Sequence, residues 1–286
     1  MKKTILIAQI GVLVTMVLCS IACTSVNKNK VEIKLISYNI RQSGLADKDG
    51  EYRWNNRKEA TIRMIKQETP SVFGLQEALL EQVEYIETNL PQYSNVGVGR
   101  DDGKNAGEFM SIFYLSDKFN LLQSGTFWLS ETPDIVSKGW DAECFRIVTW
   151  VQLQDIESKK EFYFFNTHFD HKGIVARENS AKLVLKKIKE IAGKKANIVF
   201  GGDLNSAISD PIFNPLKKYM NVARECSPIT DNKGTMNGFG TTPNNIMLDH
   251  FFCKNIVCKM FRTLDGDYGV PYISDHYPIE FVFELK

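Results

Sequence analysis

The chain carries carboxylate, amide and histidine side chains at the ends of apolar segments, and these residue types bind metal ions and phosphate. The clearest example is Asp203 with Asn205, which follow the apolar run 198–200 and two glycines. If the backbone stays extended there, both side chains leave the strand on the same side. Glycine has no Cβ, so Gly201 and Gly202 allow another chain or a ligand to come close. Taken alone, this stretch fits a reaction site and a strand-to-turn junction equally well.

Five further places repeat this pattern of a polar residue at or near the edge of an apolar strand. They hold Asn39, Glu77, His168, Asp249, and the pair Asp275 and His276. Charged groups are costly to bury alone, and gathering them at one sheet edge allows them to pair or to bind a metal. Each residue also has an ordinary interpretation, such as a strand-end cap for Asn39 or a helix N-terminal charge for Glu77. The ordered set favours a site.

Hydrophobic periodicity predicts the strands and helices that position these residues. Strands are expected at 31–41, 71–77, 93–99, 107–114, 119–129, 146–154, 161–166, 198–205, 246–252, 256–264 and 279–284. Helices are expected at 56–68, 78–90, 174–192 and 210–220. The strand 107–114 brings Glu108 to its beginning. No repeat, linker or change of composition follows Lys30, so we expect one α/β (α+β) domain over residues 31–286.

The first 30 residues have the pattern of a targeting segment. Two lysines precede an apolar stretch, and small residues lead to Cys23. This resembles a bacterial lipoprotein signal, with a signal peptide at 1–22, Cys23 as the lipidated first residue, and a polar tether at 23–30. An ordinary cleaved signal peptide and a retained membrane anchor are the alternatives. We therefore expect an exported lipoprotein, tethered to a membrane of a bacterial cell envelope on its periplasmic or surface face.

The charge balance argues against a protein that holds long nucleic acid. The 35 basic and 34 acidic residues give a net charge of +1, and removing a leader with two lysines gives +1 − 2 = −1. Such a chain lacks the broad basic surface that contacts many phosphates. A small or locally gripped substrate fits better, and a hydrophobic fraction of 43% is ample for a packed core.

Four cysteines lie in the predicted domain, namely Cys144, Cys226, Cys253 and Cys258. An exported compartment permits disulfides, but these spacings match no metal-binding cysteine pattern. Cys253 and Cys258 are placed to lie on neighbouring strands. A bridge and free or buried thiols are equally open, and the sequence assigns these cysteines no chemistry.

Six of these motifs together make the sequence resemble the endonuclease/exonuclease/phosphatase superfamily, the deoxyribonuclease I-like metal-dependent phosphoesterases. In the order of that family they are Ser37-Tyr38-Asn39, Gln76-Glu77, Asn166-Thr167-His168, Gly202-Asp203-Leu204-Asn205, Leu248-Asp249 and Ser274-Asp275-His276. The resemblance runs from residue 31 to the C-terminus and suggests a bacterial, lipoprotein-type member. It implies a four-layer α/β/β/α sandwich of two facing mixed β-sheets flanked by helices, with the site at one edge.

The resemblance also implies a metal and an attacking water. Glu77 would be the principal carboxylate ligand of a divalent metal, supported by Asn39 and Asp275. Hard oxygen ligands and a phosphate substrate favour Mg²⁺, with Mn²⁺ as a substitute. Asp203 would orient or deprotonate the attacking water, and Asn205 would help to hold the phosphate.

Two histidine–carboxylate pairs complete the implied site. His276 would contact the phosphate, with Asp249 fixing its tautomer and favouring the protonated ring. His168 would donate to the phosphate or the leaving group, oriented by Glu108. Weaker candidates for binding substrate are Arg41, Arg100, Arg146, Arg177, Asp170 and His171, while His250 and Trp128 are expected to be ordinary core residues.

The function predicted from these features is Mg²⁺-dependent hydrolysis of a phosphomonoester or phosphodiester, on a phosphorylated small molecule or a short nucleic acid. One alternative is an exported nuclease acting on short or single-stranded nucleic acid. An alternative of another class is a catalytically silent surface-binding lipoprotein. That alternative predicts missing metal or histidine positions, and none is missing from the sequence.

Overall fold

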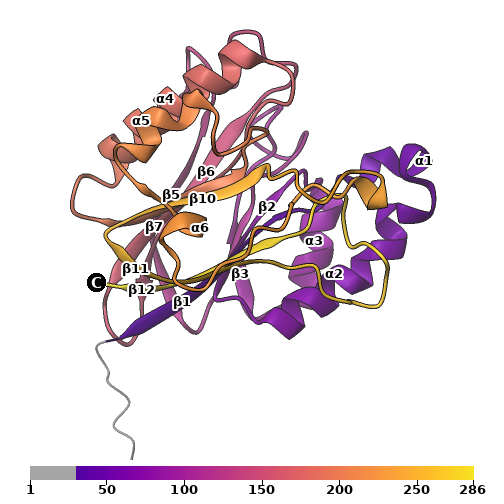
Figure 1. Cartoon of the computed structure of the whole chain (residues 1–286), viewed down its shortest axis with the longest axis horizontal. Helices are drawn as coiled ribbons and strands as arrows, with labels where there is room; N and C mark the ends of the chain where they lie inside the picture. The colour runs from indigo at the N-terminus through magenta and orange to yellow at the C-terminus, as the bar shows by residue number, and fades with distance from the viewer. Residues whose placement is uncertain (1–29) are drawn as a thin grey trace, which may run out of the picture.

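The computed structural model describes residues 30–286, which form two six-stranded β-sheets with helices on their outer faces (Figure 1). The strands are β1 (Val31–Asn39), β2 (Val72–Gln76), β3 (Tyr93–Val96), β4 (Ile112–Leu115), β5 (Phe119–Trp128), β6 (Ile147–Asp155), β7 (Glu161–His168), β8 (Asn197–Asp203), β9 (Asn221–Val222), β10 (Asp249–Lys254), β11 (Ile256–Thr263) and β12 (Ile279–Leu285). The α-helices are α1 (Ala46–Asp49), α2 (Trp54–Glu68), α3 (Leu80–Asn89), α4 (Ile174–Ile191), α5 (Asn214–Lys217) and α6 (Ala223–Cys226). Short 3₁₀ turns lie at Ser43–Leu45, Gly50–Tyr52, Pro211–Phe213 and Gly238–Gly240.

Both sheets are mixed, as predicted. The first has the order β11-β12-β1-β2-β4-β3, and the second has the order β5-β6-β7-β8-β10-β9. The pairs β1 with β2 and β7 with β8 are parallel, whereas the other neighbours are antiparallel. A parallel pair needs a crossover, and α2 and α4 supply the two crossovers on the outer faces.

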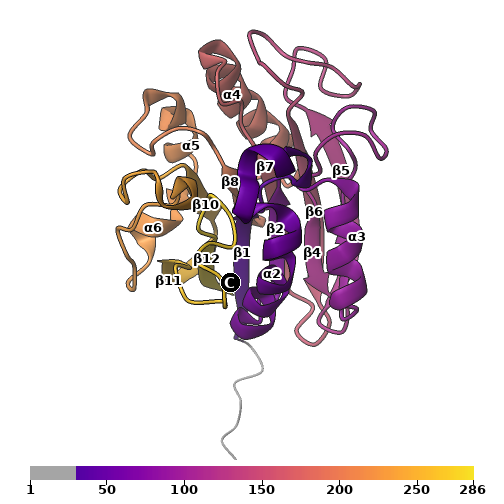
Figure 2. The same ribbon diagram turned by 90° about the vertical axis from the view of Figure 1, so that its right-hand side faces the viewer.

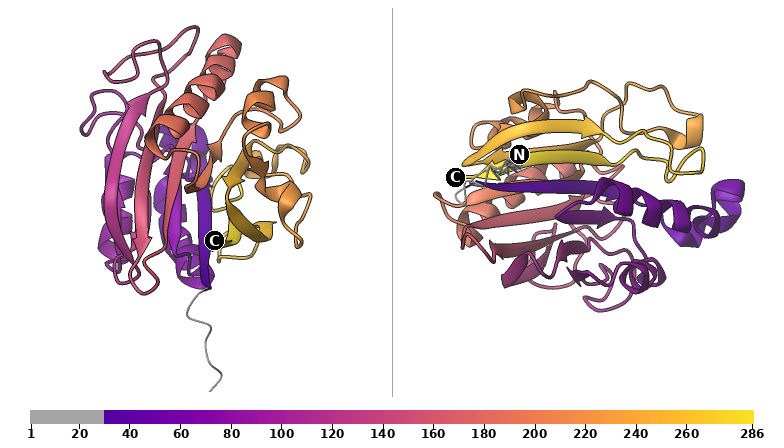
Figure 3. Two further views of the ribbon diagram at one scale, coloured as in Figure 1. Left: turned by 90° about the vertical axis from the view of Figure 1, so that its left-hand side faces the viewer. Right: turned by 90° about the horizontal axis from the view of Figure 1, so that it is seen from below.

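Three apolar layers hold the sandwich together. Between the sheets, side chains such as Leu35, Phe164 and Phe281 are fully buried. Helices α2 and α3 pack through Ile65 and Ile86 on the outer face of the first sheet (Figure 2). Helices α4 and α5 pack in the same way on the second sheet, and Figure 3 shows this layering from two further sides. The four-layer α/β/β/α architecture is therefore confirmed.

The structure differs from the predicted elements in a few places. The strand expected at 107–114 begins only at Ile112, so Glu108 lies in the segment before it. The helix expected at 210–220 is a 3₁₀ turn followed by the single turn α5, because Pro211 and Pro215 interrupt the pattern. The short elements α1, β9 and α6 were not predicted, since two to four residues carry no periodicity.

The predicted signal peptide at 1–22 and most of the tether at 23–30 lie outside the described residues. Within residues 30–286, no helix combines the length and the apolar character needed to cross a membrane. The chain begins β1 beside the C-terminal strand, with Val31 opposite Leu285 (Figure 1). Asn39 lies at the other end of the same strand.

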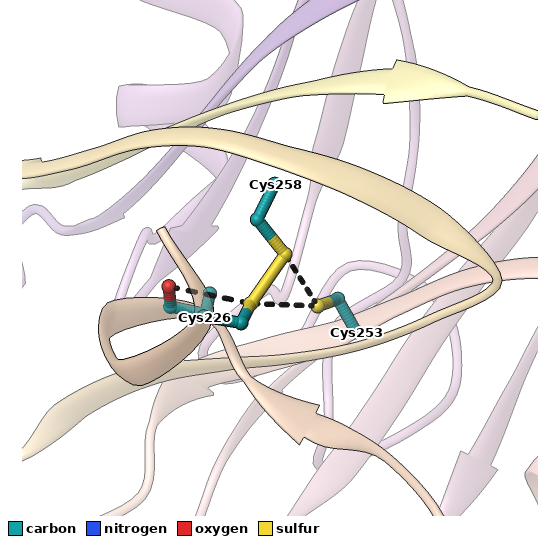
Figure 4. The surroundings of a disulfide bond; sticks show 4 residues. Cys226, Cys253 and Cys258 are labelled. Atoms are coloured by element: carbon teal, nitrogen blue, oxygen red, sulfur yellow. Dashed lines mark hydrogen bonds between the residues drawn. A yellow bond between two sulfur atoms is a disulfide. The ribbon is translucent and has the colours of Figure 1, made fainter. Parts of the chain in front are cut away.

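Three cysteines meet where α6, β10 and β11 come together (Figure 4). Cys226 and Cys258 form a disulfide. The sulfur of Cys253 lies 3.6 Å from that of Cys226 and 3.5 Å from that of Cys258. The bridge between Cys253 and Cys258 that the sequence left open is therefore not formed, because Cys226 from the unpredicted α6 takes its place. Cys253 and Cys144 are free thiols.

Candidate active site

The topology brings the predicted polar residues to one edge of the sandwich. The carboxyl ends of β1 and β2 deliver Asn39 and Glu77, because these strands run parallel. In the second sheet, His168 at the end of β7 lies beside Asp203 at the end of β8. Asp249 begins β10 directly opposite Asp203. The segment before β12 completes the edge, since β12 runs antiparallel to β1.

Three site residues follow strand ends in a backbone conformation that side chains rarely adopt. The φ angles are 58° at Arg41, 63° at Glu77 and 47° at Asn205. Such left-handed positions cost free energy for residues other than glycine, and they concentrate at functional sites. The chain therefore turns sharply after β1, β2 and β8, and each turn aims a polar side chain into the same space.

The two glycines before Asp203 allow a close approach, as expected, but the approaching group is a neighbouring strand. A Cβ on Gly202, whose φ is 138°, would lie 1.9 Å from the carbonyl oxygen of Thr167. A Cβ on Gly201 would lie 2.2 Å from the carbonyl oxygen of His250. These glycines therefore let β7, β8 and β10 pack closely enough to bring their polar ends together.

Most of the predicted residues line a single cavity of about 380 Å³. Its walls include Arg41, Glu77, Arg100, Glu108, Arg146, His168, His171, Asp203, Asn205, Asp275 and His276. Asn39, Asp249 and Asp170 are buried behind this wall and contact the residues that form it. Arg177 does not reach the cavity, because its guanidinium donates to the carbonyl oxygen of Asp170. Arg177 is therefore not brought together with the residues that line the cavity.

His276 is held between two carboxylates. Its Nδ1 lies 2.8 Å from Asp249 Oδ2, and its Nε2 lies 3.7 Å from Asp203 Oδ2. Burial alone would lower the pKa of His276, but the carboxylates of Asp249 and Asp203 outweigh burial and raise it well above its usual range. The protonated ring thus presents Nε2–H toward the cavity and can donate to a phosphate oxygen.

Asp203 is a buried carboxylate placed to accept a proton. Asn39 Nδ2 donates to its Oδ2 at 3.0 Å, and the backbone N–H of Asn205 donates to its Oδ1 at 3.0 Å. Burial raises the pKa of Asp203 strongly, although the nearby His276 lowers it. A carboxylate whose pKa approaches neutrality is suited to act as a general base.

His168 does not have the partner that was expected. Its Nε2 lies 3.0 Å from Asn205 Nδ2 and 3.3 Å from Asp203 Oδ2, while its Nδ1 has no hydrogen-bond partner within residues 30–286. Glu108 instead accepts hydrogen bonds from Gln42 Nε2 at 3.0 Å and from Arg100 Nη1. The expected pairing of Glu108 with His168 is therefore corrected, because the guanidinium of Arg100 attracts the carboxylate.

The side chain of Asn205, which was expected to hold the phosphate, contacts two groups of the protein. Its Nδ2 donates to the carbonyl oxygen of Phe169 at 2.9 Å, and its second hydrogen faces His168 Nε2. Both amide hydrogens are thus engaged, so Asn205 orients His168 rather than presenting a free donor. Burial, followed by the positive charges of Arg146 and Arg100, holds the pKa of His168 well below its usual range. These charges favour the neutral ring, and donation from Asn205 to Nε2 favours the tautomer with its proton on Nδ1.

Glu77 and Asp275 form the group that best fits a divalent metal. Both carboxylates line the cavity, and burial raises the pKa of Asp275, with the negative charge of Glu77 adding to that effect. Two carboxylates that repel each other in a cavity provide hard oxygen ligands for a cation such as Mg²⁺. Asn39 supports them through its Nδ2, which lies 3.0 Å from Glu77 Oε1, while its own oxygen accepts from the N–H of Arg41.

Three other clusters of potential ligands within residues 30–286 fit a metal less well. Asp203, Asp249 and His276 lie close enough, but His276 Nδ1 is already bonded to Asp249. In a second cluster, Asp170 already accepts five N–H donors, four from the backbone and one from Arg146. The third is the cysteine group that contains the disulfide.

Two supporting residues were missed by the sequence analysis. Gln42 bridges two site carboxylates, since its backbone N–H faces Glu77 and its side chain donates to Glu108. Asp49 is buried and binds the guanidinium of Arg41, with 2.8 Å between Oδ1 and Nη2. Both come from a segment predicted only as a polar loop, and nothing in its sequence pattern separates these residues from their exposed neighbours.

Comparison with known proteins identifies what this arrangement is similar to. Residues 36–276 match the family described as Endonuclease/Exonuclease/phosphatase. An endonuclease/exonuclease/phosphatase of known structure from Bacteroides vulgatus is 34% identical, with a TM-score of 0.85 over 90% of this chain and 100% of that one. A mannosyl-6-phosphatase from Bacteroides thetaiotaomicron is also 34% identical, with a TM-score of 0.83 over 88% and 99% of the two chains.

A more distant structure shares the fold alone. The human Nocturnin catalytic domain, solved with a bound sulfate anion, is 18% identical and has a TM-score of 0.70 over 89% of this chain and 95% of that one. The two-sheet sandwich is therefore shared well beyond the range of close sequence similarity.

Proposed function

This chain belongs to the endonuclease/exonuclease/phosphatase family, and on that premise we propose that it removes phosphate from a phosphorylated sugar or a similar small polar molecule, using Mg²⁺. Members of the family are metal-dependent hydrolases that act on phosphoester bonds, so the chain is a phosphoesterase. The identity of the metal and that of the substrate are what we propose beyond family membership.

The observation that carries the proposal is the meeting of three kinds of group in one cavity. Asp203 is a buried base, His276 is a protonated donor, and the carboxylates of Glu77 and Asp275 suit a cation. Hydrolysis of a phosphoester needs an aligned water, neutralised phosphate oxygens and a stabilised leaving group. The residues of this cavity can supply each requirement.

In the proposed mechanism, Asp203 takes a proton from a water that attacks phosphorus opposite the leaving oxygen. Asn39 and the N–H of Asn205 fix its two oxygens, so the carboxylate does not need to reorient. His276 donates from Nε2 to a phosphate oxygen, and Asp249 holds the ring in place. A divalent metal at Glu77 and Asp275 would neutralise charge on the phosphate and on the leaving oxygen.

The preference for a small monoester has two supports. The residues around the phosphate site enclose a cavity of about 380 Å³, which is a size typical of small-molecule sites. A relative of 34% identity that spans nearly the whole domain is a mannosyl-6-phosphatase. The near-neutral charge of the chain agrees with a substrate that carries few phosphates.

The test is an assay of the purified full chain on sugar phosphates, nucleotides, a phosphodiester and a single-stranded oligonucleotide, with Mg²⁺, Mn²⁺ or EDTA. We expect turnover of one or more sugar phosphates that EDTA abolishes and Mg²⁺ restores. Asp203→Ala and His276→Ala should fold and lose activity by about 10²–10³. Exclusive cleavage of the oligonucleotide would favour the nuclease alternative. Tight ligand binding without any hydrolysis would favour a silent binding protein.

We also propose that the protein is exported and tethered through a lipid on Cys23. The start of β1 and the site at Asn39 lie at opposite ends of a nine-residue strand, roughly 30 Å apart. A tether that leads into Val31 would therefore leave the cavity facing away from the membrane. The test is fractionation of cells that express the wild type or Cys23→Ser, and recovery of both in the same membrane fraction would count against the lipid anchor.

A further inference from the structure

Beyond the groups assigned to the scissile phosphate, the cavity contains a second set of cationic donors on another side. Arg100 and Arg146 line it, and their side chains are only 11% and 5% exposed. Three buried nitrogens there have no hydrogen-bond partner within residues 30–286, namely Arg146 Nη1, His168 Nδ1 and Arg100 Nε, of which the last has only a longer ion-pair contact, 3.7 Å from Asp101 Oδ1. Buried donors normally have an acceptor, so their clustering indicates that the acceptor belongs to a ligand.

The guanidinium of Arg146 is held in place by two neighbouring side chains. Its Nε lies 3.2 Å from Asp170 Oδ2, and its Nη2 donates to His171 Nδ1 at 3.0 Å, which leaves Nη1 unpaired. Asp170 is itself fixed by four backbone N–H groups, from residues 143, 144, 172 and 173. A guanidinium that is fixed on two sides and unpaired on the third is preorganised to bind an anion.

The order of the strands separates this group from the scissile phosphate. His168 lies on β7, with Asp203 beside it on β8. Arg146 directly precedes β6, which pairs with the opposite side of β7. Two strand spacings separate the backbones of β6 and β8, which is roughly 10 Å. The Nε2 edge of the His168 ring therefore faces Asp203 on one side of β7, whereas Arg146 comes from the other side of β7.

From this arrangement we propose that Arg100 and Arg146 form a second anion subsite, which binds a carboxylate or a second phosphate on the alcohol part of the substrate. The inference rests on the proposed phosphatase function and narrows its substrate to a sugar-like phosphomonoester with a second oxyanion. Besides the protonated His276, four cationic side chains line the cavity, namely Arg41, Lys48, Arg100 and Arg146. Of these, Arg41 is paired with both Asp49 and Asp275, whereas Arg100 is paired with Glu108 through Nη1 and makes no hydrogen bond through Nε.

The test uses a matched pair of substrates that differ only at the far end. 6-Phosphogluconate carries a carboxylate at C1, whereas glucitol 6-phosphate carries an alcohol there. We expect the wild type to have a kcat/KM for 6-phosphogluconate about 10- to 100-fold higher, because that is the effect of one hydrogen bond to a charged group. The difference should lie in KM, since the carboxylate is bound equally in the ground state and the transition state.

Arg146→Gln should raise KM for 6-phosphogluconate to the value for glucitol 6-phosphate, and it should leave KM for glucitol 6-phosphate unchanged. Arg100→Gln should act in the same direction, and it serves as the second variant if Arg146→Gln does not fold. Lys186→Gln removes a positive charge from the exposed face of α4, and it should change kcat and KM for neither substrate. Circular dichroism and thermal unfolding verify the fold of each variant.

Two results would overturn the subsite while leaving the phosphatase function intact. One is equal kcat/KM of the wild type for both substrates. The other is an equal loss on both substrates in Arg146→Gln, which would place Arg146 on the scissile phosphate instead. If neither compound is hydrolysed while other phosphomonoesters are, the subsite is also rejected. Absence of metal-dependent hydrolysis of every phosphoester would reject the proposed function itself.

Discussion

His276 Nδ1 lies 2.8 Å from Asp249 Oδ2, and both side chains are almost completely buried. The two residues come from different sheets, since Asp249 begins β10 in the second sheet and His276 precedes β12 in the first. The hydrogen bond therefore joins the two sheets at the active-site edge. It also fixes which ring nitrogen of His276 faces the cavity.

Replacing Asp249 by asparagine should lower kcat by about 10², because the amide no longer stabilises the positive ring that donates to phosphate. Steady-state kinetics on the preferred phosphomonoester measures this loss. Asp265→Asn is the matched control, since Asp265 pairs with Lys233 on the surface. An Asp249→Asn enzyme with wild-type kcat would show that His276 needs no negative partner.

Replacing Glu77 by glutamine should weaken the binding of Mg²⁺ by at least about tenfold, a change typical of disturbing the surroundings of a metal site. The physical reason is the loss of one of the two carboxylates that suit a cation in the cavity. Isothermal titration of metal-free protein with Mg²⁺ measures binding without reference to activity. Glu81→Gln, on the exposed face of α3, should bind like the wild type.

Much of this site was predictable because strand periodicity carries it. Asn39, Glu77, His168 and Asp203 each follow an apolar run, and parallel pairing of the strands places their ends side by side. The direction of a side chain beyond a strand end depends on groups that are distant in sequence. Glu108 illustrates this, because its carboxylate is bound by Gln42 and Arg100 rather than by His168.

The disulfide, which the sequence left open, could not be predicted for a similar reason. Cys253 and Cys258 are neighbours in sequence, and their strands β10 and β11 follow one another in the chain. The observed partner of Cys258 is Cys226, which lies in a helix of only four residues. A helix that short has no periodic signal, so its position against the sheet could not be inferred from the sequence.

Arg57 should prove essential for stability although it touches no acidic group. Its guanidinium is buried and donates to the carbonyl oxygens of Ile40 at 2.9 Å, Ile273 at 2.6 Å and Arg41 at 3.2 Å, and also to that of Tyr52. Arg57→Met takes this donor from the carbonyls of Ile40 and Tyr52, and it leaves those of Ile273 and Arg41 with one side-chain donor each, from Tyr38 and Gln82. The loss should lower the free energy of unfolding by about 3 kcal/mol. Urea unfolding measures this loss.

The control for this prediction is Arg63→Met on the exposed side of the same helix, which should change the free energy of unfolding far less. Activity should fall together with stability in Arg57→Met, because Ile40 and Ile273 lead directly into the segments that carry the site. A stable Arg57→Met protein with normal turnover would contradict this role.

Opening the disulfide, which joins α6 to β11 of the first sheet, should destabilise the fold. Cys226 and Cys258 are 32 residues apart, and closing a loop of that length contributes about 3–4 kcal/mol through the entropy of the unfolded chain. Cys226→Ser should lower the free energy of unfolding by nearly that amount. Cys144→Ser, which removes a free thiol, is the control. Urea unfolding of both variants beside the wild type measures this loss.

His250 should make the protein sensitive to mild acid. The ring is buried, its Nε2 lies 3.0 Å from the carbonyl oxygen of Ser206, and burial lowers its pKa to about 4. The unfolded chain, with a histidine pKa near 6.5, binds more protons than the folded chain between these two values. Stability is therefore complete above pH 6.5 and is lost as the pH falls toward 4, by up to roughly 3 kcal/mol.

Because carboxylates titrate in the same pH range, the prediction concerns the difference in pH-dependent stability between the wild type and His250→Gln. Urea unfolding at several pH values between 4 and 7 should give a steeper loss of stability for the wild type than for His250→Gln, which cannot gain a charge. The glutamine amide can still donate to Ser206, so the two proteins should converge in slope above pH 6.5. Parallel pH curves over the whole range would mean that His250 is already accessible to protons in the folded state.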